Sequence, residues 1–338
     1  MITLGQIGLG RWGPNVLRNF VNLPNSRVKV CCDLDERALG KVKASYPDLR
    51  TTQDYAELLH DPEIDAIVIT SSARSHYGLA KAALEHGKHV FVEKPLALRV
   101  TEGEELVLLA RERDLRLMVG HLLLYHPAVR RLKAYIDSGE LGEIRYIYSQ
   151  RLNLGQVRQD ENAMWSLAPH DISVALYLLD RGPESVSAQG RDYLRVGVPD
   201  LVFLTMNFAN GVLAHCHVSW LDPHKVRSFT VVGSKKMAVF DDMAGREKLR
   251  IFDQGVDFPE VGYGDLHTLR FGDIYIPRID MTEPLALECQ HFLECIREGK
   301  TPLTDGENGL AVLRVLTAAQ QSLDREGERI VLQSFAEA

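Results

Sequence analysis

A glycine-rich segment near the start of the chain restricts its fold more than any other feature. Gly8, Gly10 and Gly13 form the pattern G-x-G-x-x-G, directly after an apolar segment that predicts a strand and directly before one that predicts a helix. In that context the first glycine permits a tight turn, the second lets the backbone approach a pyrophosphate, and the third allows close packing of helix and strand. The segment therefore predicts the opening unit of a dinucleotide-binding fold, with phosphates at the helix N-terminus.

Apolar segments recur about every 25 to 30 residues along the first part of the chain, with helical patterns between them. This rhythm is typical of βαβ units and a parallel sheet. Pro14 suits a first helical turn, and Thr101 with Glu104 predicts a capping box at the start of a later helix. The predicted strands span residues 3–8, 28–33, 66–70, 90–93 and 117–120.

The end of the second predicted strand indicates which dinucleotide binds. Asp33 follows the last glycine of the motif by about 20 residues, where a carboxylate can accept hydrogen bonds from the adenosine ribose hydroxyls. An acid here would repel the extra phosphate of NADP, so the predicted cofactor is NAD. Arg37 leaves an alternative open, because it could flank the adenine or meet a 2′-phosphate. The glycines could also serve a plain turn, with Asp33 capping the next element.

Two residues are candidates for proton transfer. Lys94 directly follows an apolar strand and precedes Pro95, so a doubly wound sheet would place it at the carboxyl ends of the strands, where ligands bind. His170 lies in the segment 165–171, which we expect to open a helix; a first-turn position would favour the neutral imidazole that a general base needs. The alternatives are a solvated loop lysine and a capping or surface histidine.

Length and charge limit the possible functions. A chain of 338 residues predicts two domains, which we place at residues 1–121 and 122–338. The net charge of −7 argues against nucleic acid as a partner, and no apolar run approaches the length of a membrane helix. The five cysteines are odd in number and show no CxxC spacing, so we expect reduced thiols, a cytoplasmic location and no metal site.

The glycine motif, Asp33, Glu93-Lys94-Pro95 and His170 together resemble the glucose–fructose oxidoreductase, inositol dehydrogenase and rhizopine-catabolism (Gfo/Idh/MocA) family of NAD(P)-dependent dehydrogenases. The resemblance implies an α/β fold: an N-terminal Rossmann domain and a C-terminal α/β domain with an open, mainly antiparallel sheet. It also implies that Lys94 and His170 flank a sugar carbon, whose hydride passes to the nicotinamide. This chain departs from the family pattern at one position, since it has Ser166 where many relatives carry an aspartate.

Within the family, the segment from Arg151 to Asp171 is most similar to enzymes that oxidise C3 of UDP-N-acetylglucosamine or its uronic acid. Two guanidinium groups and two amides in this segment suit an anionic, hydroxyl-rich ligand, although a polar surface loop would look the same. The predicted substrate-binding residues are Arg151, Asn153, Arg158, Asn162, Trp165, Ser166 and His170. The predicted cofactor-binding residues are Gly8, Gly10, Arg11, Trp12, Gly13, Asp33, Leu34, Arg37, Thr70, Ser71, His76, Glu93 and Lys94.

The second half of the chain shows strand-like alternation at Val202, Leu204 and Met206, followed by a two-residue hairpin turn at Asn210-Gly211. Residues 284–297 and 308–325 predict helices with ordinary amphipathic spacing, and residues 253–277 predict a long connection. His215 and His217 share a strand face and could chelate a metal, but a polar sheet face explains them better. An open sheet invites self-association, so we expect a homodimer or homotetramer.

Other functions remain open at this level. The chain could be a dehydrogenase of an inositol or a free sugar, a redox-inert NAD-binding sensor, or an enzyme that oxidises and re-reduces its substrate with bound NAD. The presence of both Lys94 and His170 argues against the sensor.

Overall fold

The computed structural model describes residues 1–155, 161–257 and 268–332. Contacts divide the chain into two compact units. Unit 1 comprises Met1–Tyr125 and Thr282–Leu313, and unit 2 comprises His126–Met281 and Arg314–Ala338. The domain boundary between residues 121 and 122 stays a prediction. In the structure, residues 282–313 lie with the N-terminal unit.

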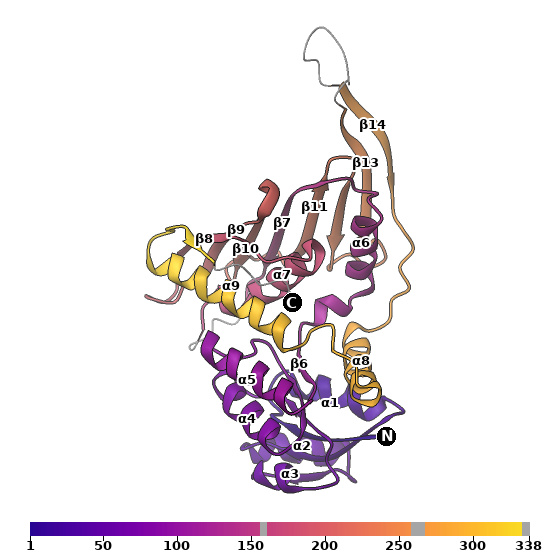
Figure 1. Cartoon of the computed structure of the whole chain (residues 1–338), viewed down its shortest axis with the longest axis vertical. Coiled ribbons are helices and arrows are strands. Elements are labelled where there is room, and N and C mark those ends of the chain that lie inside the picture. Colours follow the sequence, from indigo (N-terminus) through magenta and orange to yellow (C-terminus); the bar gives the residue numbers. More distant parts are fainter. Residues whose placement is uncertain (156–160, 258–267, 333–338) are drawn as a thin grey trace. The chain divides into compact units, whose positions relative to one another are not determined.

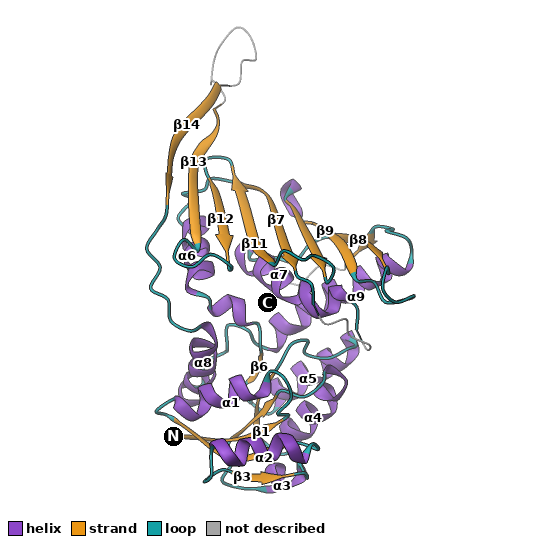
Figure 2. Cartoon of the chain, turned by 180° about the vertical axis from the view of Figure 1, so that it is seen from behind, coloured by secondary structure: helices purple, strands orange, loops and turns teal. Residues whose placement is uncertain are grey.

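Unit 1 is built on a sheet with helices packed around it (Figure 2). Among its described residues, six parallel strands follow the order β3-β2-β1-β4-β5-β6. The strands are β1 (Ile2–Ile7), β2 (Ser26–Cys32), β3 (Arg50–Thr52), β4 (Ala66–Ile69), β5 (His89–Val92) and β6 (Leu117–Val119). This is the strand order of a dinucleotide-binding Rossmann fold. The sequence pattern missed only β3, whose three residues are too few to show alternation.

The helices of unit 1 pack around that sheet. They are α1 (Gly13–Asn22), α2 (Glu36–Ser45), α3 (Ala56–His60), α4 (Ala73–Glu85), α5 (Val100–Glu112), the 3₁₀ turn η1 (Leu122–Tyr125) and α8 (Pro284–Glu298). Pro14 lies in the first turn of α1, as predicted. The capping box predicted at Thr101 and Glu104 is wrong. The N–H of Arg99 donates to the carboxylate of Glu102 at 3.2 Å, so the capping pair lies two residues earlier than predicted.

Helix α8 belongs to the core of unit 1 although it lies far along the chain. The ring of Phe292 contacts Phe91 of β5 and Phe20 of α1, with centroid distances of 5.7 and 6.4 Å. Phe91 and Phe20 contact each other edge to face at 5.9 Å. These three fully buried rings fasten α8 to the sheet.

Unit 2 contains a mainly antiparallel sheet, in which the described strands follow the order β14-β13-β12-β11-β7-β10-β9-β8-β15 (Figure 1). Only the β7–β10 pairing among them is parallel. The strands are β7 (Ile144–Leu152), β8 (Ser185–Arg191), β9 (Leu201–Asn207), β10 (Leu213–Ser219), β11 (Val226–Gly233), β12 (Met237–Asp241), β13 (Leu249–Asp257), β14 (Thr268–Tyr275) and β15 (Ile330–Val331).

Helices cover one face of this sheet: α7 (Ala163–Leu179) packs on β7, β9 and β10, and α6 (Pro127–Asp137) packs on β12. Helix α9 (Gly306–Asp324) begins in unit 1 and ends in unit 2. The long connection predicted for residues 253–277 is wrong where the structure describes it, because residues 253–257 belong to β13 and residues 268–275 to its partner β14. Residues 258–267 of that segment lie outside the described residues. The β9–β10 turn has three residues, η2 (Ala209–Gly211), closed by the hydrogen bond from Phe208 N–H to the Val212 carbonyl at 2.8 Å.

Candidate functional site

The glycine loop of unit 1 is closely packed at two of its three glycines. Gly8 has a φ of +97°, and a Cβ atom there would lie 2.5 Å from the backbone nitrogen of Ser71. A Cβ on Gly13 would lie 2.5 Å from the Gly8 carbonyl oxygen, whereas a Cβ on Gly10 would meet no atom within 4 Å. The first and third glycines are therefore needed for packing, and the second leaves open space before the N-terminus of α1.

A buried glutamine holds this loop in place. The amide of Gln6 in β1 donates to the carbonyls of Gly13 at 2.9 Å and Gly8 at 3.2 Å. The hydroxyl of Thr70, at the end of β4, donates to the same Gly8 carbonyl at 2.5 Å. Sequence reasoning missed Gln6, although a polar residue inside an apolar strand was the indication available.

Asp33 lies directly after β2, and its carboxylate is held on both sides. One oxygen accepts the N–H of Leu9 at 2.5 Å, and the other accepts the N–H of Asp35 at 2.9 Å. These bonds connect the glycine loop to the turn before α2, as expected for a residue that orients a ribose at this edge. The neighbouring predicted residues Leu34 and Arg37 are exposed.

At the ends of β4 and β5, His76 connects two loops. Its Nδ1 lies 2.7 Å from the Pro95 carbonyl oxygen, and its Nε2 lies 3.2 Å from the Ser71 carbonyl oxygen. Burial lowers the pKa of this imidazole, and the charge of Lys94 lowers it further. Both ring nitrogens face backbone carbonyls, so the structure gives His76 a role in holding the loops that carry Ser71 and Lys94.

Glu93 and Lys94 follow β5 at the same edge of the sheet. The Glu93 carboxylate accepts the N–H of Lys94 at 3.3 Å and lies against Gly120, where an added Cβ would be 3.1 Å from its oxygens. Burial raises the pKa of Glu93 to about 7, against the opposing effects of the Lys94 charge and of a hydrogen bond from Trp12. Trp12 and Arg11 are exposed on the glycine loop.

Two further titratable residues lie in unit 1 near Glu93 and Lys94, and sequence reasoning missed both. His121, directly after β6, is 1% exposed, and neither ring nitrogen has a hydrogen-bond partner among the described residues. Burial lowers its pKa to about 3, with a further contribution from Lys94. Glu288 of α8 is fully buried, and neither carboxyl oxygen has a partner in the described part of the chain. Burial and repulsion from Glu93 raise its pKa well above the usual value.

In unit 2, the histidine predicted to lie in a first helical turn lies deeper in its helix. The side chain of Asn162 accepts the N–H of Trp165 at 3.0 Å, so α7 begins at Ala163. His170 is therefore about two turns from the N-terminus, and the argument from the helix dipole does not apply to it. Ser166 lies one turn before His170 on the same helix and is buried.

Arg151 forms an ion pair with Asp171 of the same chain. Its Nε and Nη2 atoms donate to the two carboxylate oxygens of Asp171 at 2.8 and 3.1 Å. Both side chains are almost completely buried. The guanidinium group that we predicted to bind substrate thus joins β7 to α7, next to His170, through a bidentate ion pair.

The other predicted substrate-binding residues differ in their surroundings. The Asn162 amide and the indole N–H of Trp165 both donate to the side-chain oxygen of Gln320, at 2.9 and 3.1 Å. Asn153 follows β7 and donates its backbone N–H to Ser219 at 3.2 Å. Arg158 lies outside the described residues.

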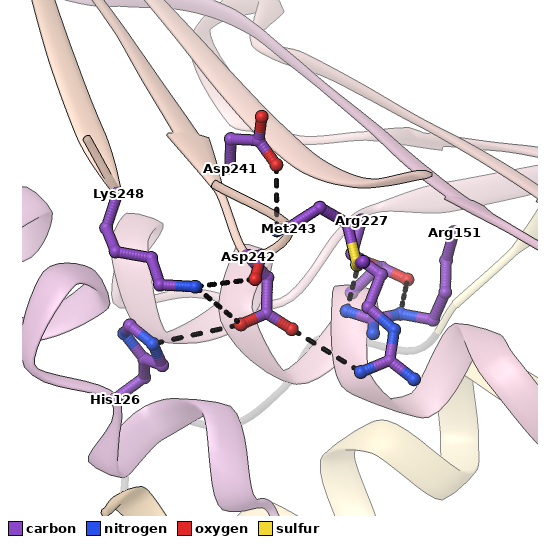
Figure 3. A network of polar contacts seen from close by, with 8 residues as sticks. His126, Arg151, Arg227, Asp241, Asp242, Met243 and Lys248 are labelled. Carbon is purple, nitrogen blue, oxygen red and sulfur yellow. Dashed lines mark hydrogen bonds and ion pairs between the residues drawn. The ribbon is translucent and has the colours of Figure 1, made fainter. Parts of the chain in front are cut away.

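A second basic residue lies beside Arg151 and was missed. Arg227 of β11 is directly opposite Arg151 in the strand register, and its side chain keeps 39% of its surface exposed. Figure 3 shows it reaching Asp242, whose carboxylate also attracts Lys248 and His126. Within the described residues, no cluster of His, Cys, Asp or Glu could hold a metal ion, and no helix is long and apolar enough to cross a membrane.

Comparison with known proteins agrees with this arrangement. Residues 2–121 match the family described as an oxidoreductase family with an NAD-binding Rossmann fold, and residues 129–239 match the Gfo/Idh/MocA C-terminal domain. The scyllo-inositol 2-dehydrogenase (NAD⁺) of Bacillus subtilis is 27% identical over 94% of this chain and 92% of that enzyme.

The UDP-N-acetylglucosamine 3-dehydrogenase of Acidithiobacillus ferrooxidans is also 27% identical, over 77% of this chain and 78% of that enzyme. Its solved structure superposes with a TM-score of 0.83 at 24% identity, covering 96% of this chain and 98% of that one. The scyllo-inositol dehydrogenase of Lactobacillus casei, solved with NAD(H) and scyllo-inositol, has the same fold, with a TM-score of 0.80 at 19% identity and coverage of 98% and 99%.

Proposed function

This chain belongs to the Gfo/Idh/MocA oxidoreductase family, and from that premise we propose that it oxidises C3 of UDP-N-acetylglucosamine or of UDP-N-acetylglucosaminuronic acid, with NAD as hydride acceptor. The chain is a dehydrogenase with an NAD-binding Rossmann domain. The observation that carries the proposal is the arrangement at one edge of the parallel sheet. The open glycine loop, Asp33 and Lys94 all lie at its carboxyl ends, where a dinucleotide binds.

The residues of unit 1 suit each part of NAD. The space before Gly10 would take the pyrophosphate, and Asp33 would accept hydrogen bonds from the adenosine ribose. Because β2 lies on one side of β1 and β4 on the other, the nicotinamide half would extend toward Thr70, Glu93 and Lys94. The bound cofactor would supply a hydride acceptor there.

We assign Lys94 and His170 to the proton chemistry of the substrate hydroxyl. One donates a hydrogen bond that orients the hydroxyl, and the other accepts its proton while the hydride leaves the same carbon. Ser166 can hydrogen-bond but cannot supply the acid that many relatives have at this position, so the proton must be exchanged without it.

The nucleotide-sugar assignment is supported by the identity to the Acidithiobacillus enzyme and by two cations at the ends of β7 and β11, Arg151 and Arg227. Asp171 engages Arg151, so Arg227 is the better candidate for an anionic group of the substrate. The competing function is an inositol dehydrogenase, which an equal identity to the Bacillus subtilis enzyme favours.

A substrate panel separates the two. The enzyme and NAD are incubated with UDP-N-acetylglucosamine, its uronic acid, UDP-glucose, myo-inositol and scyllo-inositol, and NADH is followed by absorbance. We expect NADH with an acetamido sugar nucleotide. Reaction with an inositol alone would replace the nucleotide-sugar assignment, and the absence of NADH with every substrate would leave the choice of sugar unsupported.

We also propose that the chain forms a homodimer or homotetramer through the sheet face of unit 2 that lies opposite α6 and α7. Tyr146, Tyr148, Phe203 and Leu213 keep 40–44% of their surface exposed there and alternate along their strands with buried residues. Such a patch is typical of an interface. All five cysteines are buried and unpaired, which suits the predicted cytoplasmic location.

A further inference from the structure

Helix α8 brings a second carboxyl group to the end of β5. Glu288 and Phe292 are four residues apart, so they lie on one face of the helix. The Phe292 ring contacts Phe91 of β5 at 5.7 Å, and Glu93 is the first residue after that strand. Glu93 acts electrostatically on Glu288, so the two carboxyl groups lie near each other at this end of the sheet.

Burial of the Glu288 carboxyl group is energetically costly. Glu288 is fully buried, and neither of its oxygens accepts or donates a hydrogen bond within the described residues. The electrostatic influence of Glu93 reaches it and raises its pKa further above the value that burial alone would give. Burial of an unpartnered carboxyl group is unfavourable, and it favours the neutral acid. Burial therefore favours a proton on Glu288.

Two titratable neighbours of the carboxyl pair keep their protonation state near neutral pH. His121 stays neutral because its pKa is about 3, and Cys289, also on α8, is held well above its usual pKa by burial and by Glu288. The titratable and charged groups that act on Glu93, Glu288 or their neighbours are Lys94, His76, His121, Glu283, Cys289 and Arg18.

We propose that Glu93 and Glu288 form a proton-exchanging carboxyl pair, which releases a proton when the cationic nicotinamide ring binds and takes one up when the ring becomes neutral. The inference rests on the proposed function, since it requires NAD at the carboxyl edge of the sheet. Glu288 holds the exchangeable proton and acts on the reaction through Glu93 and Lys94.

The step balances in atoms and charge. When the alcohol is oxidised, its C–H electron pair leaves as a hydride, its O–H proton leaves, and a C=O bond forms. Bound NAD⁺ would accept this hydride, and the positive charge that opposes protonation of the carboxyl pair would then be lost. The hydroxyl proton, passed on through Lys94, then neutralises one carboxylate, so the total charge of the buried region stays constant during turnover.

Calorimetry of cofactor binding tests the inference without turnover. NAD⁺ and NADH are titrated into the whole protein at pH 8 in two buffers of different ionisation enthalpy, which measures the protons released. At pH 8 Glu93, with a pKa of about 7, is mostly ionised, whereas burial raises the pKa of Glu288 well above its usual value. Glu288 is therefore the member of the pair that the proposal expects to hold the proton. We expect release with NAD⁺, little with NADH, and loss of most of the release in Glu288→Gln.

The matched control is Glu298→Gln on the same helix, where the exposed carboxylate has a pKa of about 2 and cannot exchange a proton at pH 8. This variant should release as many protons as the unchanged protein. Equal release by Glu288→Gln would identify Lys94 as the source and overturn the inference.

A second measurement does not depend on any variant. The affinity of the unchanged protein for NAD⁺ should rise relative to its affinity for NADH between pH 6 and 8, by up to about tenfold per pH unit if one full proton is coupled. A ratio independent of pH would overturn the inference and leave the proposed function intact. Failure to bind NAD⁺ at all would overturn both.

Discussion

At the scale of single residues, the orientation of one carboxylate decides the expected cofactor preference. Both Asp33 oxygens accept backbone N–H groups, from Leu9 and Asp35, so the side chain cannot swing away from a ligand at the end of β2. We therefore expect NAD to bind at least about tenfold more tightly than NADP, a difference of about 1.4 kcal/mol.

Calorimetry with both cofactors measures this preference. Asp33→Asn should narrow it, while Asp35→Asn, at the exposed N-cap of α2, should leave it unchanged. Tighter binding of NADP by the unchanged protein would mean that Arg37 governs the pocket.

The proposed proton-transfer residues form the second prediction at this scale. Lys94→Ala and His170→Ala should each lower kcat by about a hundredfold or more, because removal of a proton-transfer group has effects of this size. Affinity for NAD and the thermal unfolding temperature should change little. Unchanged turnover would remove the residue from the mechanism, and a variant that fails to fold would show a packing role instead.

At the scale of secondary-structure elements, side chains that bond to backbone groups decide where helices begin. Asn162 caps α7 and Arg99 precedes α5, and in both cases the helix starts before the predicted position. In α7, Pro169 lies inside the helix and not in its first turn.

The junction between β7 and α7 provides the prediction at this scale. Arg151→Leu should lower the free energy of unfolding by about 3–5 kcal/mol, because Asp171 would remain as an unpaired buried charge. The double variant Arg151→Leu/Asp171→Leu should recover much of the loss. Urea denaturation measures both. A stable Arg151→Leu with a raised KM would instead support the original prediction that Arg151 binds substrate.

At the scale of the whole molecule, buried acids make stability depend on pH. Burial raises the pKa of Glu93 from 4.5 to about 7, so the unfolded chain releases this proton at lower pH than the folded chain does. The folded state therefore loses stability as the pH rises from about 4.5 to about 7.

The variant Glu93→Gln has no carboxyl group to ionise at this position, so it should not lose stability over this pH range. It should be more stable than the unchanged protein at pH 8, by about 1–3 kcal/mol, and equally stable near pH 4. Denaturation curves at the two pH values measure the difference. Glu298→Gln, an exposed control, should gain nothing at pH 8. Equal stability of Glu93→Gln and the unchanged protein at pH 8 would show that Glu93 titrates normally.

Self-association is the second prediction at this scale. Tyr148→Glu on the exposed sheet face of unit 2 should reduce the oligomer to a smaller species in light scattering, because a charge would be buried in the interface. Tyr193→Glu is the matched control, since Tyr193 is 65% exposed and lies outside the strands. An unchanged mass in Tyr148→Glu would exclude this face as the interface.

The sequence by itself determined the parallel sheet and the glycine loop of unit 1, and it located Asp33 and Lys94 near the ends of two strands. Each of these features depends on a local pattern: strand periodicity, turn glycines or a polar residue at the end of a strand. Only the tertiary structure decided the partners of Arg151, Gln6 and Glu288. Asp171 lies 20 residues from Arg151, and Glu288 is brought to Glu93 across almost two hundred residues of chain. Such contacts depend on which helix or strand faces which other one. The packing energy between distant segments decides this arrangement, and local sequence patterns carry no information about it.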